Sequence, residues 1–432
     1  MTSPPMQLAT WWESRYVTGN WFGVRDVLED RGVTIATDWK ANLLWNVDGG
    51  LQKRFGYDDE WKFRLTINAS KLLGWEAVEG LSFFSDVHYR GGSGVNKYVG
   101  TGNASQFAPS RFQGGRLWRF LNAYATYTTP NVFGIRDFLT ISGGWQNPTD
   151  VFVHQPLSKF FLNSTFACNR GIGSKEVGWG ENYSAWGGYL KIRPSEWTYV
   201  QSGLYLAVPE AGTTANHGLY FAGAQPPDRN GMFWLAEVGL TPRLGPSKLQ
   251  GRYATGFVFR SVESSLASGT SNDRKMLFFV QVDQMLYREP EIDNLVPEGK
   301  DAREVIPARS KPLLNEQGLY VFSLTDFAPR HDNAEPFYVQ LGFVYKGLVP
   351  TRDTDQAGIA FAYGNYSYET ILGDGVESAP IQTYQGVVEG SYRFQLNRWA
   401  YVQPTIQYII RPSANTLVAN ATVLGFQLGV TF

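Results

Sequence analysis

The chain has 432 residues, a formal net charge of −1 and a pI near 6.5, a balance that gives no global field for binding nucleic acid. The mean hydropathy is −0.25 and no run of eighteen apolar residues occurs, which argues against a membrane-spanning helix. Aromatic residues make up 15%, and 46 glycines accompany only 18% charged residues, a mixture typical of many strands and turns.

Residues 1–32 are expected to form an N-terminal extension. The opening MTSPPMQLAT has no basic segment followed by an apolar one, so we expect any export signal to have been removed. The stretch from Trp21 to Gly32 predicts a short helix, with Phe22, Val24 and Leu28 on its apolar side and Gly32 just past its end. The pattern leaves open whether this helix lies inside or beside the strands that follow.

Residues 33–432 show period-two alternation in segments near the 9–11 residues that a tilted membrane strand needs. Sixteen such segments occur: Val33–Trp45, Trp61–Ser70, Gly80–Arg90, Arg116–Thr128, Asp137–Asn147, Ser184–Arg193, Glu196–Ala207, Gly231–Thr241, Lys248–Phe259, Lys275–Leu286, Gln317–Asp326, Pro336–Lys346, Gln356–Tyr366, Gln382–Phe394, Trp399–Ile410 and Ala421–Phe432. The last one runs to the final residue without a cap, and in an open sheet it would be an unprotected edge. The sequence therefore predicts an all-β, antiparallel up-and-down transmembrane barrel, closed by pairing of the last strand with the first.

The links between these segments alternate in length. Short links follow the even-numbered strands, and long ones such as 91–115, 148–183 and 208–230 follow the odd-numbered strands. This is the pattern of short periplasmic turns and long extracellular loops in outer-membrane barrels. The link 287–316, charged and rich in proline, breaks the pattern and is a candidate for periplasmic contact.

A soluble β-sandwich would show the same alternation, but sixteen strands are too many for one sandwich. Tryptophans also gather near strand ends, as in the aromatic girdles that contact outer-membrane lipid. These residues are Trp39, Trp45, Trp61, Trp118, Trp145, Trp186, Trp197 and Trp399.

Parity assigns polar residues to the lumen of the predicted barrel. The candidates are Asp38, Lys40, Asn42, Asp86, His88, Arg90, Arg116, Asn122, Tyr124, Arg252, Asp283, Lys346, Glu389 and Arg393. Loop 148–183 is expected to fold inward, because its apolar run KFFLNSTF is poorly suited to water, and to bring Trp179 near the solute path. Each of these charges could equally be a generic charge that keeps the pore hydrated.

The stretch VTGNWFGVRDVLEDRGVTIATDWKANLLWNVDGG resembles the N-terminal signature of the OprB family of carbohydrate-selective porins. The segments KLLGWEAVEG, GGRLWRFLNAYATY, VQLGFVYKGLVPTRDTDQAGIAFA and QPTIQYIIRPSA extend the resemblance over nearly the whole chain, which departs from the signature at Asn20, Phe22 and Val24. The resemblance implies a sixteen-stranded outer-membrane barrel that passes small sugars by diffusion, with its N-terminal helix near the periplasmic mouth.

The resemblance also implies a constriction lined by arginines with an acidic partner. HYRGGSG and GGRLWRF match its positions, which points to Arg90 and Arg116. Arg119 matches by motif as well, but parity turns it toward lipid unless a bulge intervenes.

Three alternatives remain beside a sugar porin. A general diffusion porin, or a channel for another small polar solute, fits the same pattern. An outer-membrane enzyme fits less well, because Asp86 and His88 share a face but no nucleophile motif accompanies them. Scattered histidines and the single cysteine, Cys168, predict neither a metal site nor another cofactor.

Overall fold

The computed structural model describes residues 11–101, 107–112, 116–167, 184–207, 217, 231–261, 275–290, 316–329, 335–366 and 384–432. The predicted positions Cys168 and Trp179, and most of the link 287–316, lie outside these ranges. In the described part, no helix has the length and apolarity needed to cross a membrane.

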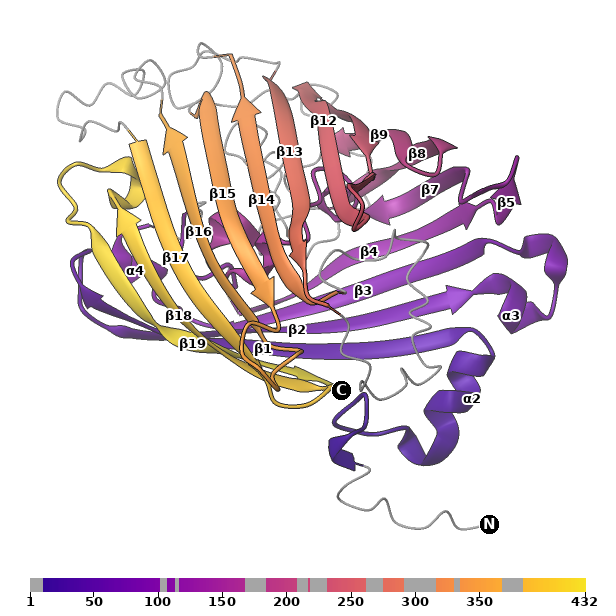
Figure 1. Cartoon of the computed structure of the whole chain (residues 1–432), viewed down its shortest axis with the longest axis horizontal. Helices are drawn as coiled ribbons and strands as arrows, with labels where there is room; N and C mark the ends of the chain where they lie inside the picture. Colours follow the sequence, from indigo (N-terminus) through magenta and orange to yellow (C-terminus); the bar gives the residue numbers. More distant parts are fainter. Residues whose placement is uncertain are drawn as a thin grey trace.

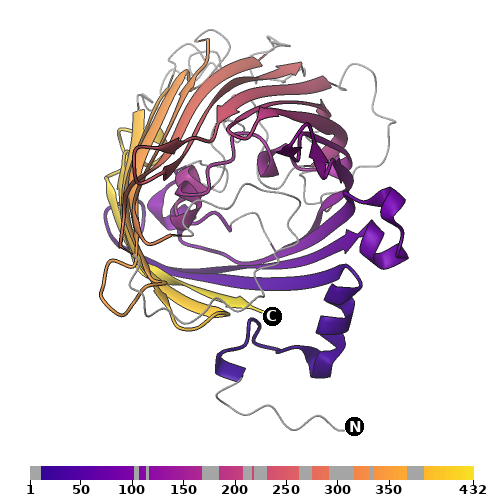
Figure 2. The same ribbon diagram turned by 45° about the vertical axis from the view of Figure 1, so that its right-hand side comes forward.

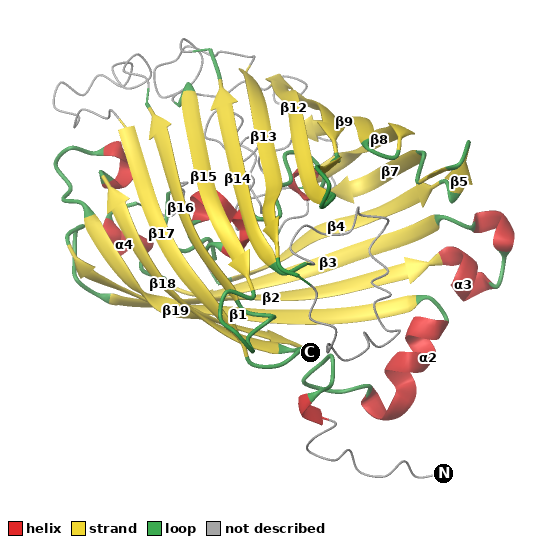
Figure 3. Cartoon of the chain, in the orientation of Figure 1, coloured by secondary structure: helices red, strands yellow, loops and turns green. Residues whose placement is uncertain are grey.

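The strands form one closed antiparallel sheet, shown from the side in Figures 1 and 3. The sixteen long strands are β1 Val33–Asp48, β2 Phe55–Asn68, β3 Leu81–Gly92, β4 Leu117–Thr128, β7 Leu139–Gln146, β8 Ala185–Ser195, β9 Thr198–Ala207, β10 Gly231–Leu240, β12 Leu249–Ser261, β13 Lys275–Arg288, β14 Gly318–Phe327, β15 Phe337–Lys346, β16 Gln356–Asn365, β17 Tyr384–Gln395, β18 Ala400–Ile410 and β19 Ala421–Thr431. Shorter strands are β5 Asn131–Val132, β6 Ile135–Arg136 and β11 Arg243–Leu244. All sixteen predicted strands are confirmed, and the largest shift is the start of β2 at Phe55, six residues before the predicted Trp61.

The barrel closes as predicted, because β1 pairs with both β2 and β19. Trp39 lies opposite Val430 in this seam, and Asp38 lies opposite Thr431. The backbone N–H of Phe432 donates to the carbonyl of Thr37 at 2.7 Å, so the pairing reaches the final residue. A closed ladder leaves no unpaired edge and satisfies the backbone without water.

The helices are short and lie in the connections. They are η1 Trp21–Gly23, α2 Val24–Asp30, α3 Ala69–Leu73, η2 Glu76–Val78, α4 Asn96–Val99, η3 Pro148–Asp150, η4 Ser158–Phe160, α5 Ser164–Ala167 and η7 Pro412–Ala414. The predicted N-terminal helix is η1 and α2, and it lies beside the barrel near the C-terminus, not in the lumen (Figures 1 and 2). Gly32 follows it with φ +81°, where an added Cβ would lie 2.7 Å from the Lys71 side chain.

A bulge in β4 changes the predicted facing of its first half. Asp86 pairs with Asn122 and Val87 pairs with Phe120, so Leu121 is an extra residue. Before this bulge the phase is reversed: Arg119 is buried, whereas Trp118 is exposed on the outer face. Arg116 lies in a bend one residue before β4 and is exposed, and the reversed phase would give it the side of Trp118 and not the predicted lumenal side.

Candidate functional site

The segment after β7 folds into the barrel, as predicted for the part of loop 148–183 that is described. Figure 2 looks into the barrel and shows this segment inside the wall. Phe152, Leu157, Phe160, Phe161 and Phe166 are all nearly inaccessible and belong to one hydrophobic cluster with inner-wall residues of β10 to β17. We call residues 148–167 the inner loop. Its apolar run is removed from water by the inner face of the sheet.

Glu389 on β17 anchors the middle of the inner loop. Its two carboxylate oxygens accept from the backbone N–H groups of Leu162 and Asn163, each at 2.8 Å. Ser391 Oγ and Thr405 Oγ1 also donate to Oε1. This predicted lumenal residue is fully buried. Because its carboxylate is occupied by two backbone donors of the inner loop and two hydroxyl donors of the wall, the contacts place Glu389 as a support for the loop.

A second anchor lies where the loop leaves β7. Glu237 Oε2 accepts from the N–H of Val153 at 2.9 Å, and its Oε1 accepts from Tyr199 Oη at 2.6 Å and Arg252 Nη2 at 3.0 Å. Arg252 also donates to the carbonyl of His154. Buried carboxylates are stable only when paired and hydrogen-bonded, and here the pairing fixes the loop to β9, β10 and β12.

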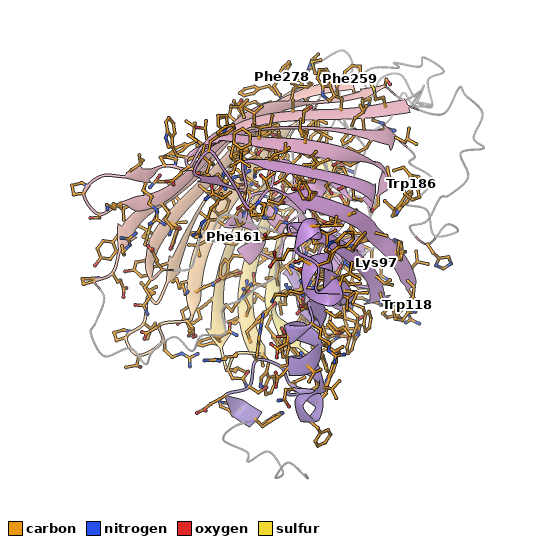
Figure 4. All side chains as sticks on the ribbon, turned by 90° about the vertical axis from the view of Figure 1, so that its right-hand side faces the viewer. Lys97, Trp118, Phe161, Trp186, Phe259 and Phe278 are labelled. Atoms are coloured by element: carbon orange, nitrogen blue, oxygen red, sulfur yellow. The ribbon has the colours of Figure 1, made fainter. Side chains whose placement is uncertain are left out.

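Small residues on the inner wall make room for the loop's aromatic rings. A Cβ added to Gly358 on β16 would lie 2.8 Å from Phe160 Cε1 and 2.9 Å from Phe161 Cζ. Ala360 and Ala362 follow on the same face and are buried. In Figure 4 Phe161 points into the barrel interior, whereas Phe259, Phe278 and Trp186 lie on its outside.

A second segment, 107–112, also folds inward and meets the inner loop. The N–H of Ser164 donates to the carbonyl of Ala108 at 2.9 Å, and Gln407 Nε2 donates to the carbonyl of Pro109 at 3.0 Å. Ser110 Oγ donates to Asp58 on β2 at 2.8 Å. The segment therefore links the inner loop and β18 to β2, and it brings Arg111 to the inner side of the wall, a position that strand parity did not predict.

Four partly exposed cations on the inner side of the wall lie close enough to interact electrostatically. They are Lys40 on β1, Lys62 on β2, Arg111 on the segment 107–112 and Arg393 on β17, and the carboxylate of Asp38 lies near them. The Arg393 guanidinium lies 4.4 Å from the ring centroid of Tyr401 and 5.2 Å from that of Phe160 in the inner loop. We call Lys40, Lys62, Arg111 and Arg393 the basic lining.

Among the described residues, two cations of the basic lining have no neutralising carboxylate within ion-pair distance. Asp38 pairs with Arg64, and Glu60 pairs with Arg90 and Lys62. Within the described ranges, Lys40 and Arg393 have no carboxylate partner at ion-pair distance. Arg393 Nε donates only to the neutral amide of Gln403, at 2.7 Å. This surplus favours hydrogen-bond acceptors and anions in the lumen.

Arg90 lies behind the basic lining. It is 2% exposed, its Nε and Nη2 lie 2.7 and 2.6 Å from Glu60 Oε1, and its Nη1 donates to the carbonyl of Arg111 at 2.9 Å. The guanidinium therefore holds the backbone that carries Arg111. The predicted site residue Arg90 is inward-facing, as parity required, but its described contacts place it as a positioning residue.

The predicted residues His88 and Asp86 belong to a second buried network. His88 Nε2 lies 3.0 Å from Asp86 Oδ2, and Asp86 Oδ1 accepts from Asn122 at 2.9 Å. Asn122 in turn accepts from the N–H of Asn147, where the inner loop begins. The network thus ties β3 and β4 to the start of the loop.

The other predicted site residues do not lie in one place. Asp38, Lys40 and Arg393 lie near one another, whereas Tyr124 faces inward elsewhere and packs on Phe84 at 5.3 Å between ring centroids. Sequence reasoning missed Lys62, Glu60 and Arg64, although the alternation DEWKFR on β2 carries the signal. In the described ranges, no group of three or more metal-ligating side chains forms a metal site.

A closed barrel of sixteen long strands, narrowed by an inward-folded loop and charged around the opening, is the architecture of an outer-membrane porin. Residues 45–432 match the family model of the carbohydrate-selective porin, OprB family. The chain belongs to this family. It is a porin of the bacterial outer membrane, a channel and not an enzyme.

Similar proteins agree over the full length. Porin B of Pseudomonas aeruginosa is 23% identical, with 97% of this chain and 92% of that protein covered. The putative porin QuiX of Acinetobacter baylyi is 21% identical, with 97% and 94% covered. The high-pH structure of Pseudomonas putida OprB superposes with a TM-score of 0.80 at 22% identity, covering 97% of this chain and 99% of that one.

Proposed function

We propose that small sugars diffuse passively through the lumen past the basic lining. The observation that carries the proposal is the pair of cations without carboxylate partners, Lys40 and Arg393, on strands β1 and β17. Guanidinium and ammonium donors replace water on sugar hydroxyls, and the ring of Tyr401 beside Arg393 offers an apolar face for a pyranose. Single hydrogen bonds to charged groups are weak enough for the sugar to leave.

We also propose that the end with the short turns and the C-terminus faces the periplasm. Outer-membrane barrels place short turns there and long loops outside. In this orientation the inner loop descends from the extracellular end, and residues 11–32 lie at the periplasmic mouth.

The test measures sugar block and ion selectivity of single channels in planar bilayers. Lys40→Ala and Arg393→Ala are each expected to weaken sugar block by about tenfold, because each removes one charged hydrogen-bond donor. Both should also lower the anion-to-cation permeability ratio. Arg116→Ala removes an outward-phase arginine and is the matched control, expected to keep wild-type values. If both lining variants keep wild-type block and selectivity, the assignment of the solute path is wrong.

A second candidate is a channel for a small anionic polar solute. The surplus positive charge of the basic lining favours it. Comparing neutral sugars with sugar acids as blockers in the same experiment separates the two. A sugar porin predicts block by both, whereas the second candidate predicts block by the acids alone.

A further inference from the structure

A groove of about 640 Å³ lies on the outer face of the barrel at its short-turn end. Its lining residues are Val349, Arg352, Tyr392, Phe394, Leu396 and Val402. Five of the six are apolar or aromatic, and the sixth is a cation. It lies apart from the lumen, so the solute path does not account for it.

Outward-facing residues of two strands form the floor of the groove. Tyr392 and Phe394 alternate with the inward Arg393 on β17, and their ring centroids are 4.5 Å apart. Val402 on β18 lies opposite Phe394 in register. The turn after β15 forms the side wall and contributes Val349 and Arg352, and Figure 2 shows it in orange, standing out from the barrel. The floor therefore belongs to the belt that faces lipid acyl chains.

The cation at the side wall is fixed and presented outward. Arg352 Nε and Nη2 lie 2.8 and 2.9 Å from the Asp355 oxygens, and the two side chains are 39% and 1% exposed. Asp355 also accepts from Tyr392 Oη and from the N–H of Gln395, each at 2.9 Å. The negative charge of Asp355 is thus partly neutralised by two further hydrogen-bond donors, and its carboxylate is buried beneath the Arg352 guanidinium. A second exposed cation, Arg398, lies in the next turn.

We propose that this groove binds one glycerophospholipid of the inner leaflet of the outer membrane. One acyl chain lies over Tyr392, Phe394 and Val402, and the phosphate contacts Arg352 at headgroup level. An apolar channel ending at a pinned arginine matches an amphiphile with an anionic head, and in the orientation proposed above the groove opens at the depth of the periplasmic headgroups. Nothing in the proposal depends on what crosses the lumen.

The experiment compares wild type with Val402→Trp, which fills the groove from the floor and leaves the Arg352–Asp355 pair intact. Ile359→Trp on neighbouring β16 is the matched control, since Ile359 is outward-facing and 56% exposed. The proteins are purified from outer membranes in mild detergent, checked for folding by heat-dependent migration, and delipidated stepwise. Retained lipid is counted by native mass spectrometry, and phosphatidylethanolamine and phosphatidylglycerol are then added back. If Val402→Trp does not fold, Leu396→Trp replaces it.

Wild type and Ile359→Trp are expected to keep one phospholipid per barrel after the others are lost, and Val402→Trp to keep none. Arg352→Gln should weaken rebinding by about tenfold. Four results would each overturn the proposal. Val402→Trp could retain as much phospholipid as wild type, or wild type could retain none. The retained molecule could be lipopolysaccharide, or the groove could hold a second copy of the chain that Val402→Trp displaces. Sugars should block the Val402→Trp channel as strongly as the wild-type channel. A failure of the lipid proposal can therefore be distinguished from a failure of the proposed solute path.

Discussion

Single residues of the lumen divide into those that face the solute path and those that hold them in place. In the proposed solute path Lys40 and Arg393 are of the first kind, and the contacts of Arg90 and Glu389 make them the second. Parity predicted that all four point inward, and the structure agrees. Parity carries no information about depth or partners, because those depend on segments folded in from elsewhere in the chain. Arg111 is the clearest case, since it lies on a connection and Arg90 holds its carbonyl.

The pairing of Arg90 with Glu60 should contribute stability more than selectivity. Arg90→Met leaves the Glu60 carboxylate buried with Lys62 and His88 beside it, and breaking a buried pair in this way costs about 3 kcal/mol. The double variant Arg90→Met with Glu60→Gln removes both charges and should recover much of that loss. Urea unfolding of the refolded barrel measures the free energy of unfolding of wild type, of the single variant and of the double variant. Equal destabilisation by the single and double variants would contradict the role given to the ion pair.

Among the elements, β4 shows most clearly what the sequence could and could not reveal. Alternation predicted the existence of all sixteen strands, because one face of each must suit lipid and the other a polar lumen. The bulge at Leu121 could not be predicted from the alternation of polar and apolar residues. One extra residue reverses which side chains face inward on one side of the bulge, and alternation alone does not show where such a reversal occurs. As a result the motif arginine Arg119 is buried on the inner face, the reverse of the parity assignment, and Arg116 lies just before the strand and is exposed.

Removing the bulge should leave the facing of β4 unchanged. Deleting Leu121 joins Phe120 to Asn122, so Phe120 still pairs with Val87, and Arg119 still pairs with His88 on the inner face. An arginine on the lipid face would cost about 2–4 kcal/mol at mid-membrane and less near the rim. Because the deletion avoids that cost, we expect it to give the heat-resistant folded band, weakened by the loss of the buried Leu121 side chain. Leu121→Ala loses most of that side chain but keeps the extra residue and is the control. Loss of the folded band in the deletion variant, with a normal band for Leu121→Ala, would show that the extra residue is needed for the facing of this strand.

At the scale of the whole molecule, the two ends of the chain meet at the closing seam. Val17 N–H donates to the carbonyl of Thr431 at 2.9 Å, and Arg25 Nη1 lies 3.4 Å from the carbonyl of Phe432. The Phe432 ring lies 5.3 Å from that of Trp61. Burial lowers the pKa of Arg25, whose guanidinium lies 3.6 Å from the ring of Tyr16. The N-terminal extension therefore contacts the last strand.

Loss of the terminal residues should prevent closure. Deleting residues 430–432 removes ladder partners of Asp38 and Trp39, and Phe432→Asp places a charge beside Trp61. Both variants should lack the faster-migrating unboiled form on gels, because an unclosed sheet does not resist detergent. Phe432→Tyr keeps the aromatic ring and should fold normally. Wild-type migration of the deletion variant would show that the seam is not needed for closure.

The inner loop covers only one arc of the wall. Inward residues of β13 to β15, such as Asp283, Phe322 and Gln340, are almost fully covered, whereas Lys40 and Lys62 on β1 and β2 remain partly open. Among the described residues, the anchors Glu237 and Glu389 of the inner loop therefore lie away from β1 and β2, which carry two of the four cations of the basic lining. In the proposed solute path, substitutions on β1 and β2 would change the solute preference without disturbing the contacts that hold the inner loop. Related channels can therefore differ in the solute they pass while keeping the same inward-folded loop.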